Sequence, residues 1–89
     1  MKLKVITVNT HIEKDNCDYI TLTVADDKKG GFSGSYGIKK GHAKTVFALG
    51  DGKLTAQRQG EVIFSAETSS GFAKVEDNVV TVTVESVEM

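Results

Sequence analysis

His42, His11 and Cys17 are the side chains of this chain best suited to chemistry near neutral pH. Metal-binding histidines usually occur in spacings such as HxH or HExxH, and structural zinc sites add CxxC pairs. None of these spacings is present in the sequence. A lone histidine in a loop is more often a hydrogen-bonding residue at a surface or interface. We therefore expect no metal site, and we expect His42 to make contacts of that kind.

Cys17 and His42 leave one enzymatic interpretation open, in which the thiol is the nucleophile and the imidazole is its base. No base stands beside Cys17 in the sequence, so a half-buried structural thiol is the favoured interpretation. A single cysteine also excludes an internal disulfide and is typical of a reducing compartment. The sequence thus predicts a protein that is not an enzyme, with no catalytic residue and no cofactor.

Two further groups of residues resemble ligand sites but lack the full pattern. Four aspartates lie within residues 15–27, yet no Asp-x-Asp-x-Asp-Gly loop with a closing glutamate is present. The glycine-rich run of residues 30–41 lacks the GxxxxGK[ST] pattern, and no helix is expected after it. We expect solvated turns at the aspartates, and neither a calcium site nor a phosphate loop.

The balance of charge argues against nucleic acid and anionic membranes as partners. The chain has 11 basic and 12 acidic residues, which gives a net charge of −1, whereas such partners require a basic excess on one face. The opening residues carry no apolar run long enough for a signal peptide, and no later run is long enough to cross a membrane. We expect a soluble, cytoplasmic chain with no direct membrane insertion.

The glycine-rich run is predicted to be a shaped loop. Five glycines lie within residues 30–41, and glycine accepts positive φ and close backbone approach. Shaped loops on a rigid scaffold often carry function, so the segment from Gly37 to Ala43 is the predicted centre of the site. Lys39 and Lys40 within it are either solvated or in contact with a polar partner.

The rest of the chain predicts short strands that hold this loop. Alternating polarity and frequent β-branched residues indicate strands at residues 2–8, 18–24, 43–49, 53–57, 61–66, 72–75 and 79–84, with a short one around Ile12. In the strand of residues 53–57, Leu54 and Ala56 are expected to point inward. A short helix remains open for residues 43–49, because periodicity alone does not exclude it. Residues 26–31 are predicted to form a charged turn. The fold predicted is all-β, a two-sheet flattened β-sandwich or barrel of about 8–10 short strands, in a single domain over residues 1–89.

Several segments match one family in the right order. Gly37-Ile38-Lys39-Lys40-Gly41-His42-Ala43 is similar to a Gly-Ile/Leu-x-Pro-Gly/Asn-His-Ala loop. Residues 70–82 are similar to a Gly-Gly-Phe-x-x-Val…Asn-x-Val-x-Val hairpin, and residues 2–7, 19–23 and 50–55 match the family's other strands. Together they resemble the amino-terminal β-sandwich domain of the F-type ATP synthase epsilon subunit. The resemblance implies the fold of that domain.

The resemblance also implies an adaptor without chemistry of its own. In this family, the central-stalk subunit bridges the gamma shaft and the ring of c subunits in ion-coupled, proton-transporting ATP synthesis. By position, the residues implied to meet the c ring are Ser35, Tyr36, Gly37, Lys39 and Lys40. Those implied to meet gamma are Thr7, His42 and Phe47. The location implied is the cytoplasmic face of the bacterial plasma membrane, as a peripheral protein.

Four features depart from the family's pattern. Lys40 stands where the family usually has proline, Ser35 stands where it often has a carboxylate, and residues 26–34 are longer than the usual turn. The sequence also stops at Met89, where the family continues into a helical hairpin that carries inhibition and, in some members, nucleotide binding. We expect that hairpin to be absent here, so neither activity is implied for these 89 residues.

A free-standing β-sandwich module that binds a carbohydrate or another small molecule is the alternative from a different class. Its recognition surface is expected at residues 30–42. The chain has four phenylalanines, two tyrosines and no tryptophan, and this scarcity of aromatic rings is unfavourable for stacking on sugars. The absence of a secretory signal also argues against this alternative.

Overall fold

The computed structural model describes residues 1–26 and 32–89, and over these residues the chain consists of strands and turns without a helix. No helix in this part of the chain is therefore long and apolar enough to cross a membrane. The described residues form ten strands: β1 (Lys2–Ile6), β2 (His11–Lys14), β3 (Tyr19–Asp26), β4 (Phe32–Lys39), β5 (Thr45–Leu49), β6 (Gly52–Arg58), β7 (Glu61–Thr68), β8 (Gly71–Glu76), β9 (Val79–Val84) and β10 (Val87–Glu88).

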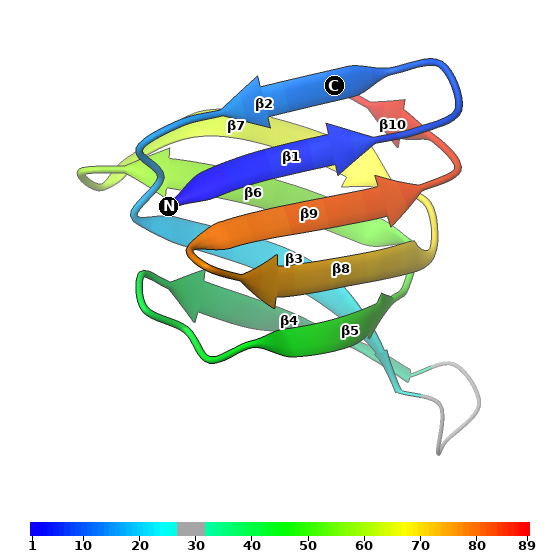
Figure 1. Cartoon of the computed structure of the whole chain (residues 1–89). Coiled ribbons are helices and arrows are strands. Elements are labelled where there is room, and N and C mark those ends of the chain that lie inside the picture. The colour runs from blue at the N-terminus through cyan, green and yellow to red at the C-terminus, as the bar shows by residue number, and fades with distance from the viewer. Residues whose placement is uncertain (27–31) are drawn as a thin grey trace.

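The strands form two layers that face each other (Figure 1). The front layer has the order β5-β8-β9-β1-β2, and the back layer has the order β10-β7-β6-β3, with β4 on the other edge of β3. Hydrogen bonding passes from one layer to the other where Val24 of β3 pairs with Leu49 of β5. The prediction of an all-β, two-sheet sandwich of short strands is confirmed.

Alternation along the strands builds the core between the layers. Successive side chains of a strand point to opposite faces, and the inward positions are the apolar ones. Leu3 and Val5 of β1 and Ile20 of β3 are fully buried in one cluster with residues of both layers. The expected inward positions in β6, Leu54 and Ala56, are buried as well.

Most of the predicted strands are present. The short strand around Ile12 is β2, and residues 45–49 form strand β5, so the helical alternative for residues 43–49 is wrong. The closing hairpin is formed by β8 and β9, with Asp77 and Asn78 at positive φ in the turn, as expected for a two-residue connection. The sequence did not indicate β10, a two-residue strand that pairs with β7.

The loop predicted over the glycine-rich run of residues 30–41 is largely wrong. Phe32–Lys39 form strand β4, which pairs with β3 over eight positions from Tyr19↔Lys39 to Asp26↔Phe32. The predicted charged turn falls mainly on residues 27–31, which lie outside the described part of the chain. Residues 30 and 31 lie outside the described part as well, and within the described part of the predicted loop only residues 40 and 41 are not in a strand; they belong to a turn of residues 40–44.

Gly37 is needed for close packing in a strand, and not for a loop conformation. Its φ is not positive, whereas the φ of Gly41 in the following turn is +79°. A Cβ atom at Gly37 would collide with the hydroxyl and the ring of Tyr19, which lies diagonally across from it on β3. An aromatic ring that covers a glycine on a neighbouring strand is a known way to fix strand register.

We expect Gly37→Ala to lower the free energy of unfolding by about 1–2 kcal/mol, because the Tyr19 ring must move to make room. Gly71→Ala should cost more, about 3 kcal/mol, because there the added Cβ meets the backbone carbonyl of Thr83, and backbone moves less readily. Chemical denaturation followed by circular dichroism measures both. In a Tyr19→Ala background the cost of Gly37→Ala should vanish; an unchanged cost would contradict this packing explanation.

Candidate interaction site

The turn of residues 40–44 lies at one end of the sandwich, here called the turn end. It connects β4 of the back layer to β5 of the front layer, so it crosses from one layer to the other (Figure 1). The β6–β7 and β8–β9 turns lie at the same end. The opposite end carries the β5–β6 turn with Asp51.

Three rings form a cluster beside this turn. The Tyr36 ring lies 4.8 Å from that of Phe47 between centroids, at an interplanar angle of 46°. The His42 ring lies 5.8 Å from Tyr36, edge to face, and 6.1 Å from Phe47. Tyr36 is 40% exposed, whereas His42 and Phe47 are partly buried. The cluster joins the edges of β4 and β5 and leaves aromatic surface open to solvent.

His42 is fixed on both ring nitrogens. Its Nδ1 lies 2.8 Å from the carbonyl oxygen of Ala43, and a carbonyl only accepts, so Nδ1 carries a proton. In the neutral ring, Nε2 then accepts from the Tyr36 hydroxyl at 2.9 Å. Thr45 donates to the same Ala43 carbonyl at 2.9 Å. With both nitrogens engaged, the imidazole acts here as a structural hydrogen-bonding group.

Asp18 ties the start of the turn to the back layer. One carboxylate oxygen lies 3.1 Å from the Lys40 ammonium, and the other accepts from the backbone amide of Gln59 at 2.7 Å. The Gln59 hydrogen bond, followed by the Lys40 contact, holds the pKa of Asp18 below its ordinary value. The sequence predicted only a solvated turn residue at this position. It gave no signal for these contacts, because both partners are distant along the chain.

The β8–β9 hairpin ties down the middle and the end of the same turn. The side-chain oxygen of Asn78 accepts from the Gly41 amide at 3.0 Å. Glu76 pairs with Lys44 at 3.3 Å and with Lys74 at 2.9 Å. The hydrogen bond from Lys74, then that from Lys44, keeps the pKa of Glu76 below its usual value. Asn78 was expected only as a hairpin residue, and its contact with the turn was not predicted.

The predicted c-ring residues do not share one face. Ser35, Gly37 and Lys39 occupy every second position of β4, so they face the same side of the strand. Ser35 and Lys39 are exposed there. Tyr36 points to the opposite side of β4, where it stacks on Phe47. Lys40 follows in the turn and is engaged with Asp18.

The predicted gamma residues are divided as well. His42 and Phe47 belong to the aromatic cluster, whereas Thr7 lies in the β1–β2 turn, where its hydroxyl bonds to Asn9. Across the front layer, Phe47 of β5 is aligned with Val5 of β1, with one residue of β8 and one of β9 between them. Three strand spacings separate Phe47 from Val5, a distance of about 14 Å. Thr7 lies two residues beyond Val5, so it is not part of the cluster.

Cys17 and His42 do not form a catalytic pair. Cys17 is fully buried, and its thiol lies 3.5 Å from the carbonyl oxygen of Lys14. Burial raises the pKa of the Cys17 thiol and so keeps it protonated and unreactive. His42 instead bonds to Tyr36 and Ala43. Among residues 1–26 and 32–89, no three side chains of the metal-binding types are grouped.

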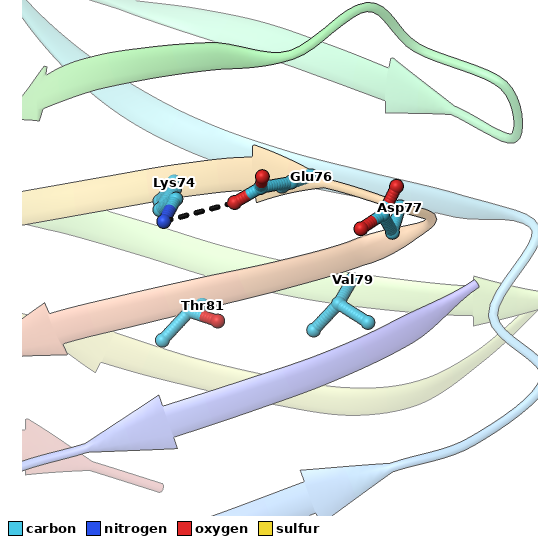
Figure 2. Close-up of a pocket in the computed structure, with 5 residues that line it drawn as sticks. All are labelled: Lys74, Glu76, Asp77, Val79 and Thr81. Atoms are coloured by element: carbon cyan, nitrogen blue, oxygen red, sulfur yellow. Dashed lines mark ion pairs between the residues drawn. The ribbon is translucent and has the colours of Figure 1, made fainter.

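The hollow on the outer side of the β8–β9 hairpin is open and polar. Figure 2 shows the Lys74–Glu76 ion pair on β8, with Asp77 at the turn and with Val79 and Thr81 on β9. Ligand sites for small molecules are mostly apolar and enclosed, so this hollow gives no support to the ligand-binding alternative. That alternative also depended on a loop over residues 30–42, most of which is strand β4.

An apolar surface on the outside of the front layer was not anticipated from the sequence. Val46 and Phe72 are 65% and 63% exposed. The strand register aligns four residues across the front layer, in the order Ala48, Phe72, Thr83 and Ile6. Contiguous exposed apolar residues are typical of surfaces that meet another protein. The alternating pattern predicted strands here but did not indicate which face is left uncovered.

The two lowered pKa values predict sensitivity to acid. A carboxyl whose folded pKa lies below its unfolded value of about 4 stabilises the fold above that value, and this stabilisation is lost as the pH falls through the folded pKa. We expect the double variant Asp18→Asn/Glu76→Gln to lose less stability than wild type between about pH 5 and pH 2. Urea denaturation at several pH values measures this.

The control for this experiment is Asp51→Asn, at the opposite end of the sandwich. Asp51 is exposed and takes part in none of the ion pairs seen among the described residues. The Asp51→Asn variant should show the same dependence of stability on pH as wild type. A double variant with the same acid profile as wild type would show that the two carboxylates do not couple to folding.

Comparison with known proteins identifies the family. All 89 residues match the model of the β-sandwich domain of the ATP synthase delta/epsilon chain. The ATP synthase epsilon chain of Geobacter sulfurreducens is 32% identical over 88 residues, and that of Nitratidesulfovibrio vulgaris is 31% identical. These matches cover 99% of this chain but only 58% and 60% of the two relatives. The chain therefore spans less than two thirds of their length.

Solved structures of ATP synthases contain the same fold. A chain of the central stalk and c-ring structure of the Tetrahymena thermophila mitochondrial enzyme superposes with a TM-score of 0.73 at 17% identity, over 97% of this chain and 63% of that one. A chain of the Euglena gracilis mitochondrial enzyme gives 0.68 at 26% identity, over 96% and 50%. The first shows the fold alone, and the family match carries the identification. The chain belongs to the family of ATP synthase delta/epsilon chain β-sandwich domains.

Proposed function

We propose that this domain is a central-stalk adaptor of a rotary F-type ATP synthase, which bridges the gamma shaft and the ring of c subunits. The observation that carries the proposal is the family match over the whole chain, together with relatives named as ATP synthase epsilon chains. The adaptor is a non-catalytic part of the complex and takes part in ion-coupled ATP synthesis by transmitting rotation. No cofactor enters this role.

The proposed contact with the c ring is made by β4 and the start of its turn. Ser35 and Lys39 present polar side chains on one exposed face. The Tyr19 ring covers Gly37 between them, so the proposed part of Gly37 in this contact is to seat that ring. Lys40 stands next to them and is held by Asp18. Tyr36 is also proposed for the c-ring contact, but its ring points to the opposite side of β4 and packs with His42 and Phe47. We therefore propose that Tyr36 contributes both to the c-ring contact and to the contact with gamma.

The proposed contact with gamma is centred on His42 and Phe47. Together with Tyr36 they form a compact, partly exposed aromatic surface, and clustered aromatic residues are frequent at the centres of interfaces. Thr7 is proposed as a separate contact with gamma, away from this cluster. The apolar surface of Val46 and Phe72 also fits a protein partner.

The proposed location follows from these partners. A domain held between gamma and the c ring is peripheral to the membrane, and the bacterial sources of the two relatives support the cytoplasmic face of the plasma membrane. A net charge of −1 fits protein partners better than a polyanion. We propose no nucleic-acid partner and no insertion into the lipid.

The test is capture of the purified chain on immobilised gamma and on gamma assembled with the c ring. Wild type should bind, and His42→Ala should raise the dissociation constant about tenfold, because it removes the ring that joins Tyr36 to the turn. Lys39→Glu should weaken binding only when the c ring is present. Asp51→Asn, at the opposite end of the sandwich, is the matched surface control and should bind like wild type.

Failure of the folded wild-type domain to bind either partner would reject the proposed function. Circular dichroism of each variant separates loss of binding from loss of folding. If Asp51→Asn weakens capture more than His42→Ala, the domain binds by the opposite end.

A further inference from the structure

The turn of residues 40–44 is held at three points by side chains from segments that are remote along the chain. Lys40 pairs with Asp18 at 3.1 Å, and Lys44 pairs with Glu76 at 3.3 Å. Between them, the Gly41 amide donates to the side chain of Asn78 at 3.0 Å. The two ion pairs are exposed, and exposed pairs contribute little. Of these three contacts, the one with Asn78 is the one that acts directly on the backbone of the turn.

Gly41 is the point at which the turn most needs to be held. Its φ of +79° lies in the left-handed region, and nothing lies within 4 Å of the position that a Cβ atom would occupy. Glycine visits many conformations at low cost, so local sterics do not hold it in place. Inside the turn, the backbone bond from the His42 amide to the Lys39 carbonyl is long, at 3.2 Å.

Asn78 is itself well placed to act as a fixed support. It has a φ of 62° in the two-residue turn between β8 and β9, a conformation that Asn adopts more readily than most residues. Its backbone carbonyl accepts from the Lys2 amide at 2.9 Å, which anchors it to β1. The side chain then reaches across to Gly41. Asn78 thus links the turn to the body of the front layer.

We propose that Asn78 is a positioning residue for the partner-binding turn, acting through the Gly41 amide. This inference rests on the proposed function, since the turn carries Lys40 and His42. A turn ordered before binding loses less conformational freedom when it binds. Asn78 therefore raises affinity for gamma without touching gamma itself. The contribution of Asn78 to the binding free energy is expected to equal that of its hydrogen bond with the Gly41 amide.

The test uses three variants of the 89-residue chain. Asn78→Gly keeps a residue that accepts positive φ but removes the oxygen acceptor, and Asn78→Asp keeps the acceptor. Glu76→Gln is the matched control, because it weakens another link from the same hairpin to the same turn. Two readouts are needed: amide hydrogen exchange at Gly41 by NMR, and the dissociation constant for gamma.

We expect Asn78→Gly to speed exchange at Gly41 about five- to tenfold and to raise the dissociation constant for gamma by a similar factor. Asn78→Asp should restore both values, and Glu76→Gln should change each less than about twofold. A structural role alone would change the midpoint of thermal unfolding and would not show this paired change with rescue by aspartate.

Two results would overturn the inference while leaving the proposed function intact. One is faster exchange at Gly41 with unchanged affinity for gamma, which means that order in the turn does not matter for binding. The other is unchanged exchange at Gly41, which means that Asn78 does not hold it. If wild type itself fails to bind gamma, the proposed function is rejected, and so is a role of Asn78 in binding. Exchange at Gly41 still decides whether Asn78 positions the turn.

Discussion

The shared pairing of β3 is the constraint on which the rest of the structure depends. This strand pairs with β4 along one edge, and along the other it pairs first with β6 and then, at Val24, with β5 of the front layer. The Gly50 amide reinforces the junction by donating to the carbonyl of Thr23. Among the described residues, β4 pairs with no strand other than β3. The placement of β4 and of the start of the turn that follows it is therefore set by β3, with Tyr19 packed over Gly37.

The turn end combines this rigid support with weak individual contacts. Each surface ion pair there contributes little by itself, but Asp18 holds the turn from the residue before β3, and Glu76 and Asn78 hold it from the β8–β9 hairpin. Several weak contacts from separate directions leave a short segment few ways to move. The aromatic cluster adds packing between the edges of β4 and β5. This combination suits a domain proposed to transmit rotation between two partners, where shape must persist and no chemistry is needed.

The features that could be predicted from the sequence are those that depend on residues close together along the chain. Alternation identified most of the strands and their inward faces, including the buried positions Leu54 and Ala56, because side chains alternate strictly in a strand. It misjudged β4, because a glycine in a loop and a glycine beneath a ring look the same in the sequence. Tyr19, which explains Gly37, lies 18 residues earlier and on another strand. The roles of Asp18 and Asn78 also depend on partners that are remote along the chain, so local patterns did not reveal them.

The most direct measurement is a cryo-EM reconstruction of this chain assembled with gamma and the c ring. We expect the turn of residues 40–44 and the exposed face of β4 to lie against the partners, with the Tyr36, His42 and Phe47 rings covered by gamma. The β5–β6 turn with Asp51 should face solvent. A reconstruction in which the β5–β6 end is buried and the turn of residues 40–44 is free would contradict this assignment.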